Sequence, residues 1–254
     1  SRRDCRPSSS SRAPPRADGG EHARRAYQES ADRYVRRAET NLWNAHWDRP
    51  VIRSLLPRIG GRRVLDAGCA GGANTEWLLE QGASVVALDI TPRMIELTRR
   101  RVGDRADVHL HDLREPMGFL VDRSIDVVLS SLAIPYVQDL GPVFIEFGRV
   151  LRRDGCLVLS THHPFSDWQW SDLPDYYSTG VVEDLWSEGV VHRFWRRTME
   201  ELLGSLFQAG FLLDGYLEPT PSDDVLSQFP DVDVSRTPDF VFLRAIPDPA
   251  AAEH

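Results

Sequence analysis

Residues 63–91 read RVLDAGCAGGANTEWLLEQGASVVALDIT. The apolar run Val64-Leu65 predicts a short strand, and the glycine-rich segment Ala67–Gly72 predicts a tight turn after it. A helix over Asn74–Gln81 and a second strand over Val85–Asp89 complete the pattern. Strand, turn, helix and strand in this order form the first βαβ unit of a doubly wound α/β sheet.

The acids of this stretch indicate what the turn binds. A carboxylate at the end of the second strand, here Asp89, can accept hydrogen bonds from both hydroxyls of a ribose. Asp66 lies two residues before Gly68, and no G-x-G-x-x-G pattern follows it. A pyrophosphate prefers bare N–H groups at a helix start, whereas the ammonium and sulfonium of S-adenosylmethionine (SAM) tolerate a nearby carboxylate. Asp66 therefore favours SAM over NAD, and a ligand-free βαβ unit remains the alternative.

The motif Asp66-Ala-Gly68-Cys-Ala70-Gly71-Gly72, with Asp89, resembles the first two motifs of the class I SAM-dependent methyltransferases. The form VLDxGCGxG is that of the UbiE-like and small-molecule members. Ala70 stands where that pattern has its middle glycine. Alanine can occupy most of the φ < 0 space of glycine, so we expect cofactor binding to survive the change. The resemblance covers roughly residues 25 to 247 and includes FGRVLRRDGCLVLS at 147–160.

The resemblance implies how SAM is bound. Asp66 and Gly68 approach its methionine portion, Asp89 accepts from the ribose, and Asp112 accepts from the adenine amino group. Asp112 could instead be an ordinary turn aspartate. The predicted cofactor-binding residues are Asp66, Gly68, Cys69, Ala70, Gly72, Asp89, Ile90, Met94, Asp112, Leu113 and Ser130, with Ser131 as the alternative to Ser130.

The rest of the chain predicts further strands and helices in alternation. The resemblance implies a Rossmann-like, doubly wound, seven-stranded sheet with six parallel strands and an antiparallel last strand. Thr91 and Pro92 predict an N-cap and the first position of a helix. Further strands are predicted at 107–110, 124–130, 156–160, 210–217 and 238–246, and further helices at 91–102, 140–151 and 198–209.

Composition and periodicity divide the chain. Residues 1–20 are rich in Ser, Pro, Arg and Gly and are expected to be disordered, as are residues 248–254. Residues 21–60 predict helices, the first reaching to about Asp48, and Tyr27 and Tyr34 suit either a lid over a ligand or packing on the core. Residues 61–247 form the predicted methyltransferase domain. The segment 41–50, NLWNAHWDRP, is similar to a stretch that precedes the first strand in one bacterial branch of the family.

An aromatic-rich insertion over 162–197 follows the fifth strand. It holds four tryptophans, which suit either the lining of an apolar substrate pocket or packing of the insertion onto the core. These tryptophans are Trp168, Trp170, Trp186 and Trp195. The predicted substrate-binding residues are Tyr27, Tyr34, Tyr136, His163, Trp168 and Trp195.

Methyl transfer from a sulfonium needs alignment and a dry site more than a strong nucleophile. An oxygen acceptor also has to lose a proton, for which an imidazole is the usual base. His162 and His163, at the exit of the fifth strand, are the candidate catalytic residues, and structural turn histidines are the alternative. Many relatives carry a histidine after the fourth strand where this chain has Pro135.

Composition limits the partners and the compartment. A length of 254 residues suits one large domain, and no apolar run approaches the roughly 18 residues that span a bilayer. The three cysteines show no metal-binding spacing and no even disulfide set, which fits a reducing cytoplasm. The net charge of −8 disfavours a nucleic acid partner. A monomer or a homodimer is expected.

The leading hypothesis is a methyltransferase that acts on O, N, S or C of a small apolar or aromatic metabolite. A peptide or protein methyltransferase would share the same core. A SAM-binding protein without turnover is a third hypothesis, and an NAD-type oxidoreductase is a fourth, although it has no use for Asp66.

Overall fold

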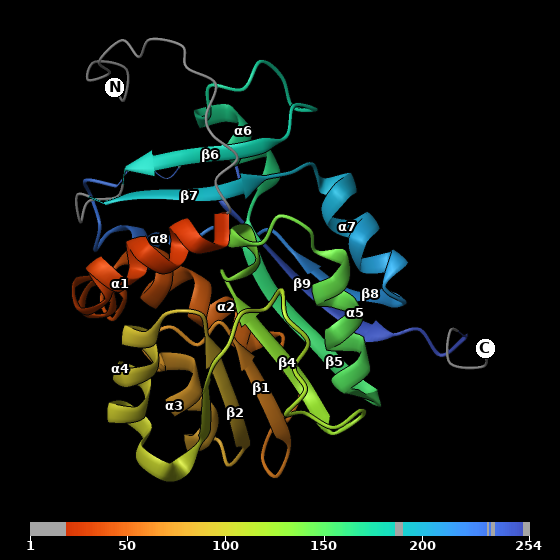
Figure 1. The fold of residues 1–254 in the computed structure, drawn as a ribbon. Helices are drawn as coiled ribbons and strands as arrows, with labels where there is room; N and C mark the ends of the chain where they lie inside the picture. Colours follow the sequence, from red (N-terminus) through yellow and green to blue (C-terminus); the bar gives the residue numbers. More distant parts are fainter. Residues whose placement is uncertain (1–18, 186–189, 233, 235–236, 251–254) are drawn as a thin grey trace.

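The computed structural model describes residues 19–185, 190–232, 234 and 237–250. Its centre is a seven-stranded sheet with the order β3-β2-β1-β4-β5-β9-β8 (Figure 1). Strand β9 is antiparallel to both of its neighbours, and the other six strands share one direction, which confirms the predicted Rossmann-like sheet. The strands are β1 (Arg63–Ala67), β2 (Ser84–Asp89), β3 (Asp107–Leu110), β4 (Ile125–Ser131), β5 (Leu151–His162), β8 (Phe211–Leu217) and β9 (Phe240–Pro247).

Helices cover both faces of the sheet because successive side chains of a strand point to opposite faces. In β1, Val64 joins one buried core and Leu65 joins the other. The core of Val64 includes side chains of α2 (Arg49–Ser54), α3 (Ala73–Glu80) and α4 (Pro92–Val102). The core of Leu65 includes side chains of α5 (Gly141–Val150) and α7 (Met199–Gln208), and Figure 1 shows α5 and α7 away from α3 and α4.

The structure extends one local prediction and adds detail to another. Strand β5 is longer than the predicted 156–160, because its pairing with β4 resumes after a register shift and its last residues pair with β9. Thr91 is the N-cap of α4 and Pro92 lies in its first turn, as predicted, but the Thr91 side chain makes no capping hydrogen bond. Its backbone N–H instead donates to Asp89 Oδ1 at 2.8 Å, so the end of β2 and the start of α4 are joined through Asp89.

The N-terminal helical segment is broken rather than continuous. It consists of α1 (Gly19–Ala38), a π-helical segment η1 (Leu42–Asp48) and α2. Asn41 begins η1 by accepting a hydrogen bond from the backbone N–H of Asn44 at 2.7 Å. Residues 1–18 of the predicted tail lie outside the described residues, and Gly19 and Gly20 already belong to α1.

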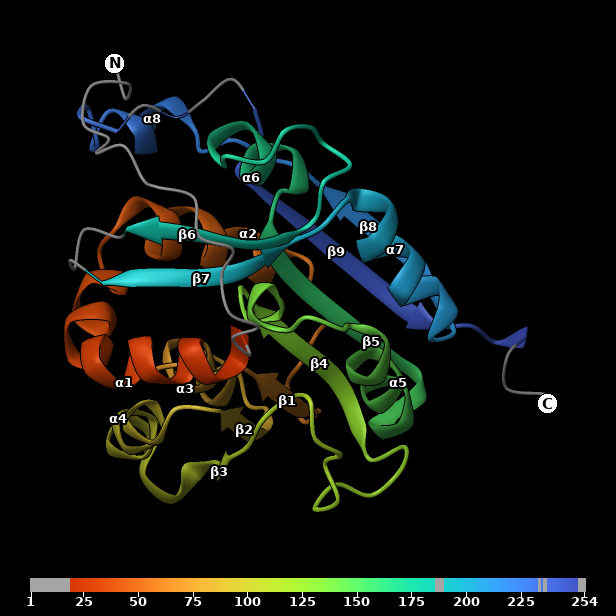
Figure 2. The ribbon, with the colours of Figure 1, turned by 45° about the horizontal axis from the view of Figure 1, so that its top comes forward.

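The insertion after β5 forms α6 (Pro164–Trp170) and a separate antiparallel pair, β6 (Gly180–Leu185) and β7 (Val191–Arg196). Figures 1 and 2 both place this pair beside α1, and the ring of His192 in β7 packs on Tyr27 of α1. Trp186 lies outside the described residues. The short elements are η2 (Gly103–Arg105), η3 (Ile134–Tyr136) and α8 (Asp223–Leu226).

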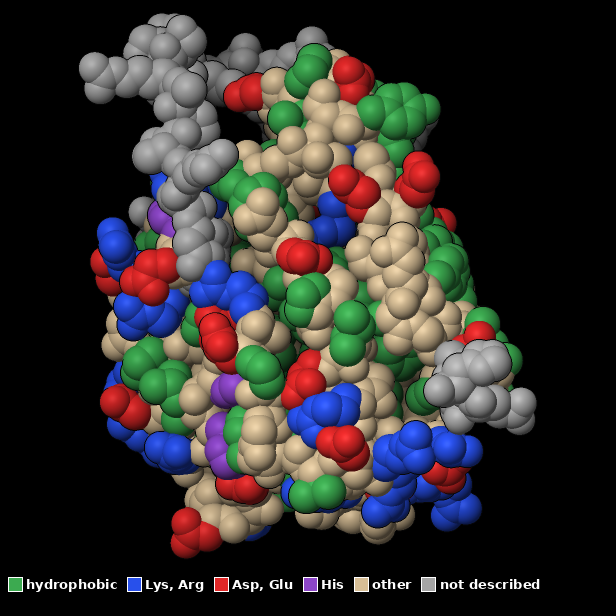
Figure 3. Space-filling model, turned by 45° about the vertical axis from the view of Figure 1, so that its right-hand side comes forward, with side chains coloured by type: hydrophobic (Ala, Val, Ile, Leu, Met, Phe, Trp, Pro, Cys, Tyr) green, Lys and Arg blue, Asp and Glu red, His purple; other side chains and the backbone are tan. Residues whose placement is uncertain are grey.

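The surface carries charged side chains of both signs, and the C-terminal segment is hydrogen-bonded at Asp248. On the described part of the face in Figure 3, acidic and basic side chains are interspersed, with basic side chains gathered toward its lower end. None of the helices in the described ranges combines the length and the apolar character needed to cross a bilayer. Of the predicted tail 248–254, Asp248 is held by a hydrogen bond from its N–H to the Gly210 carbonyl at 2.8 Å, and residues 251–254 are not described.

Candidate functional site

Two cavities meet at the carboxyl ends of the central strands. Cavity 1, about 710 Å³ with its open mouth included, extends from α1 and η3 to the loop after β3. Cavity 2, about 510 Å³ on the same measure, extends along η1 and the start of α3. Five residues line both cavities and form what we call the junction: Tyr34, Gly68, Ala70, Ser131 and Leu132. Ligands of open α/β sheets bind at this edge.

The turn after β1 forms one wall of the junction. Gly68 has a φ of +94°, and a Cβ added there would lie 2.4 Å from the Cβ of Ala133. Only glycine fits this position. Ala70 has a φ of +46°, so the expectation that its alanine would use negative φ is wrong. The left-handed conformation costs a non-glycine residue about 1 to 2 kcal/mol.

Asp89 ties this turn to β2. Its Oδ2 accepts from the backbone N–H of Ala70 at 3.0 Å, and its Oδ1 accepts from that of Thr91. A carboxylate has about four acceptor positions, so each oxygen can accept a further hydrogen bond. Burial raises the pKa of Asp89, while the two backbone N–H groups favour its ionised form. Asp89 therefore faces cavity 1 as an oriented acceptor.

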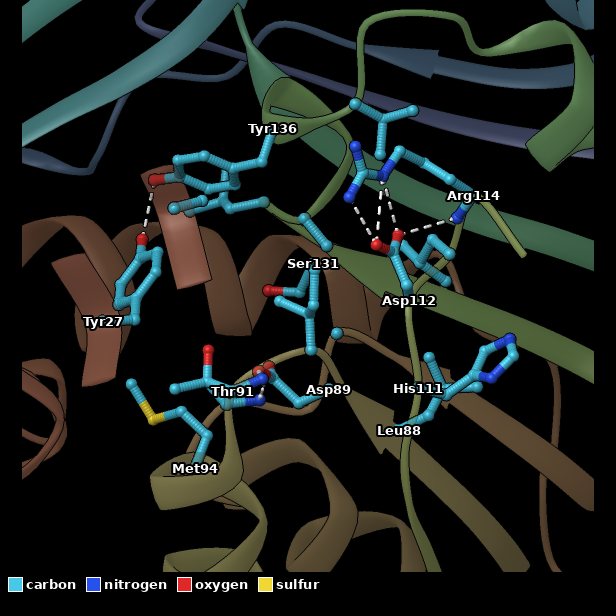
Figure 4. Close-up of a pocket in the computed structure, with 18 of the residues that line it drawn as sticks. Tyr27, Leu88, Asp89, Thr91, Met94, His111, Asp112, Arg114, Ser131 and Tyr136 are labelled. Atoms are coloured by element: carbon cyan, nitrogen blue, oxygen red, sulfur yellow. Dashed lines mark hydrogen bonds and ion pairs between the residues drawn. The ribbon is translucent and has the colours of Figure 1, made fainter. Parts of the chain in front are cut away.

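The far end of cavity 1 contains the loop after β3. Asp112 and Leu113 line it together with Ile90 and Met94, and all four are among the predicted cofactor-binding residues. The Asp112 carboxylate is already paired with Arg114, whose Nη2 lies 2.5 Å from Asp112 Oδ2 (Figure 4). A ligand amino group at Asp112 would have to share this carboxylate with Arg114. Sequence reasoning missed Arg114, for which the chain gave no periodic signal.

Three tyrosines form the opposite wall of cavity 1, which we call the tyrosine wall: Tyr27, Tyr34 and Tyr136. The ring of Tyr27 meets Tyr34 edge to face at 5.1 Å and Tyr136 at 5.5 Å. The hydroxyls of Tyr27 and Tyr136 face each other at 2.6 Å (Figure 4). Burial raises the pKa of all three, to about 12 for Tyr34, so these hydroxyls are neutral at physiological pH.

Cavity 2 carries polar residues that were not predicted. Asn44, Asp48 and Arg49 line it, all from the NLWNAHWDRP segment. Arg49 donates to the Ala38 carbonyl and lies 3.5 Å from Glu39 Oε2. The similarity of residues 41–50 to a stretch of the family was the one sequence feature that pointed to these residues. The periodicity of the segment does not show that their side chains line a cavity.

Three predicted cofactor residues are not among the described residues that line either cavity: Asp66, Gly72 and Ser130. Asp66 is buried and accepts from Thr75 Oγ1 at 2.6 Å, and burial raises its pKa to about 6. Ser130 points into the core, and Ser131, on the opposite side of the strand, lines the cavities instead. Cys69 lines cavity 2, and burial raises the pKa of its thiol well above the ordinary value.

The two candidate catalytic histidines are also not among the described residues that line either cavity. His163 precedes α6, where its Nδ1 accepts from the N–H of Phe165 and its Nε2 lies 2.7 Å from Glu218 Oε1. His162 packs edge to face on Phe194, and burial lowers its pKa to about 4. Their contacts favour the structural alternative.

The predicted substrate residues divide into two groups. Tyr27, Tyr34 and Tyr136 come together at cavity 1, whereas His163, Trp168 and Trp195 are not among its described lining residues. Trp168 packs within the insertion against Phe165 and Tyr176. Trp195 lies in β7, opposite Val181 of β6. Trp168 and Trp195 therefore pack within the insertion. His192, also in the insertion, contacts the ring of Tyr27.

The chemistry of this site fits SAM. Asp89 and Asp112 offer carboxylate acceptors along cavity 1, where a nucleoside presents hydroxyl and amino donors. Gly68 lines both cavities and lets the turn pack directly on Ala133, because a Cβ at this position would clash with that residue. Cavity 2 adds the cationic Arg49, which matches the carboxylate of an amino acid, and the carboxylate of Asp48, which can face a cationic group of the ligand.

Comparisons with known proteins agree with this chemistry. Residues 65–159 match the model of a methyltransferase domain family. A SAM-dependent methyltransferase of Mesorhizobium loti is 29% identical, with a TM-score of 0.68 over 78% of this chain and 96% of that one. An uncharacterized protein of Haemophilus influenzae is 24% identical over 78% of this chain and 86% of its own length.

A demethylmenaquinone methyltransferase of Tropheryma whipplei is 30% identical over 46% of this chain. The matched part is 48% of that enzyme, so the chain spans about half of the length of this relative. The sheet order, the cavities at its carboxyl edge and these similarities agree. The chain belongs to the class I SAM-dependent methyltransferases, and its cofactor is S-adenosylmethionine.

Proposed function

We propose that this methyltransferase transfers the methyl group of SAM to a small apolar or aromatic metabolite. The observation that carries the proposal is the meeting of two cavities at Gly68 and Ala70, with Asp89 on one side and Arg49 on the other. A ligand with a nucleoside at one end and an amino acid at the other suits this arrangement.

We place the adenosine in cavity 1 and the methionine portion in cavity 2. Asp89 accepts from the ribose, Asp112 takes the adenine amino group, and Arg49 pairs with the methionine carboxylate. When bound, SAM supplies a methyl group on a positively charged sulfur, and the electron pair of the carbon–sulfur bond remains with sulfur when the acceptor's lone pair takes the methyl carbon.

The acceptor occupies the part of cavity 1 next to the tyrosine wall. Ala23 and Val137 line this end together with Tyr27 and Tyr136, so its surface is largely apolar and aromatic. An apolar wall excludes water, and alignment of the reacting atoms alone can lower a barrier by roughly 7 to 11 kcal/mol. The name of the Tropheryma whipplei relative, a demethylmenaquinone methyltransferase, supports an apolar aromatic acceptor.

Calorimetric titration with SAM tests the cofactor placement. Replacing Asp89 by Ala removes an ionised acceptor, and we expect SAM affinity to fall by about a hundredfold. Asp107→Ala is the matched control, because this carboxylate is 65% exposed on β3 and pairs with His109. Equal SAM affinity in the Asp89→Ala variant and the control would refute the placement.

The acceptor class is tested separately by measuring S-adenosylhomocysteine (SAH) formed from SAM in the presence of quinols, phenols, aliphatic amines and short peptides. We expect turnover with the quinols or phenols. Turnover confined to the peptides would contradict the small-molecule proposal and leave the cofactor placement standing.

A further inference from the structure

The junction residues line both cavities, so a ligand that occupied both would contact them. With adenosine in cavity 1 and methionine in cavity 2, the sulfur that links them would lie at the junction, which Tyr34, Ser131 and Gly68 line. The following inference rests on that proposed placement. A positively charged sulfur at this place would lie near an aromatic ring and oxygen lone pairs.

Ser131 is oriented by a buried carboxylate. Its Oγ lies 2.5 Å from Asp48 Oδ2 and donates its proton to it, and Ser160 donates to Asp48 Oδ1 in the same way. Because the Ser131 proton is engaged by Asp48, the remaining lone pairs of Oγ are available to the cavities that Ser131 lines. Asp48 is 1% exposed and also lines cavity 2.

Tyr34 adds an aromatic ring at the same place. The ring is held edge to face by Tyr27, and Tyr34 lines both cavities. Burial, and after it the negative charge of Asp48, raises the pKa of Tyr34 to about 12, so the ring stays neutral beside a carboxylate. The face of a neutral aromatic ring attracts cations.

We propose that Tyr34, Ser131 and Asp48 form a cation site for the sulfonium, so that the protein binds SAM more tightly than SAH. The two molecules differ only in the methyl group and the positive charge at sulfur. A site with an aromatic ring, oriented lone pairs and a nearby carboxylate favours the charged form. Because methyl transfer removes this charge, the product is held less firmly than the substrate, which favours its exchange for new SAM.

The test is calorimetric titration of the full chain with three ligands: SAM, SAH and sinefungin, which places an ammonium group where SAM carries its sulfonium. For the wild-type protein we expect SAM and sinefungin to bind more tightly than SAH. Tyr34→Leu removes the ring and should reduce the ratio of SAM to SAH affinity by about two- to thirtyfold. Tyr34→Phe is the matched control, since it keeps the ring and should keep the ratio.

Asp48→Asn keeps the shape of the side chain but removes its charge, and it should lower the same ratio by at least about threefold. Equal affinities of the wild-type protein for SAM and SAH would overturn the inference without any variant. The inference would also be overturned if Asp48→Asn or Tyr34→Leu lowered the affinities for SAM and for SAH by the same factor. In that case Asp48 would serve the methionine ammonium or the fold. Failure of all three ligands to bind would instead refute the proposed cofactor site itself.

Discussion

Two walls of the same cavity are built in different ways. The first, which we call the sheet-edge wall, consists of Gly68, Ala70, Asp89 and Ile90, all within 23 residues of sequence, and backbone hydrogen bonds to Asp89 fix its shape. The tyrosine wall joins α1 to η3, where Tyr27 and Tyr136 are 109 positions apart in the sequence, and side-chain contacts hold it together. The difference indicates that local chain geometry sets the wall where we propose that the cofactor binds, and that tertiary packing sets the wall where we propose that the acceptor binds.

The largest expected effect concerns the carboxylate behind the sheet-edge wall. Burial raises the pKa of Asp66 from 3.8 to about 6, so the fold favours its protonated form. Its contribution to stability is present below pH 3.8 and is lost as the pH rises through about 6, in total about 3 kcal/mol. Urea unfolding of the wild-type protein and Asp66→Asn between pH 4 and pH 7 measures this contribution. We expect the difference in free energy of unfolding between the wild-type protein and Asp66→Asn to change by about that amount over this pH range. A difference that stays constant with pH would show that folding does not raise the pKa of Asp66.

A second prediction extends the comparison to cavity 2. Arg49→Ala should weaken SAM binding about tenfold, because a charge-assisted hydrogen bond to the methionine carboxylate is lost. Calorimetry with adenosine as a second ligand separates the loss of this contact from a change in the shape of the site. Adenosine lacks the carboxylate and should bind the wild-type protein and Arg49→Ala with equal affinity. Arg58→Ala, an exposed arginine outside both cavities, is the control. A matching loss of adenosine affinity would mean that Arg49 shapes the turn.

The tyrosine wall is expected to depend on its hydroxyl pair. Tyr27→Phe and Tyr136→Phe should each lower the free energy of unfolding by about 1 kcal/mol, because each removes the hydrogen bond of 2.6 Å between the two hydroxyls. In a double-mutant cycle, the variant that carries both substitutions should have nearly the same free energy of unfolding as either single variant. Strictly additive losses would show that the two segments are not joined through these hydroxyls.

The smallest expected effect lies in the sheet-edge wall. Ala70→Gly relieves a left-handed alanine, but glycine gains entropy in the unfolded chain, and the two effects nearly cancel. We expect stability to change by less than about 1 kcal/mol and SAM affinity to stay equal or rise. A marked loss of SAM affinity would indicate that the Ala70 methyl group contacts the cofactor.

The sequence predicted the sheet-edge wall residue by residue, because a strand end, a glycine turn and an acid fix one another locally. It left Ser130 and Ser131 as alternatives, since the alternation of a buried strand cannot be read from a run in which nearly every position is apolar, and the structure places Ser131 at the cavities. It also gave Ala70 the wrong sign of φ, because a resemblance to glycine does not show which region of conformational space the turn uses.

Tertiary packing decided the remaining residues. His162 and His163 do leave the sheet at its carboxyl edge, but their rings contact Phe194 and Glu218. Asp48 and Arg49 reach cavity 2 only because η1 follows a break at Asn41, which helical periodicity alone does not predict. The tyrosines were predicted from their chemistry, whereas their mutual contacts were not.

A crystal structure with SAH bound would test the cofactor placement directly. We expect the ribose hydroxyls within hydrogen-bonding distance of Asp89, the adenine beside Asp112 and Leu113, and the amino acid end in cavity 2 near Arg49. An adenosine in cavity 2, or a ligand bound away from the Gly68 turn, would contradict it.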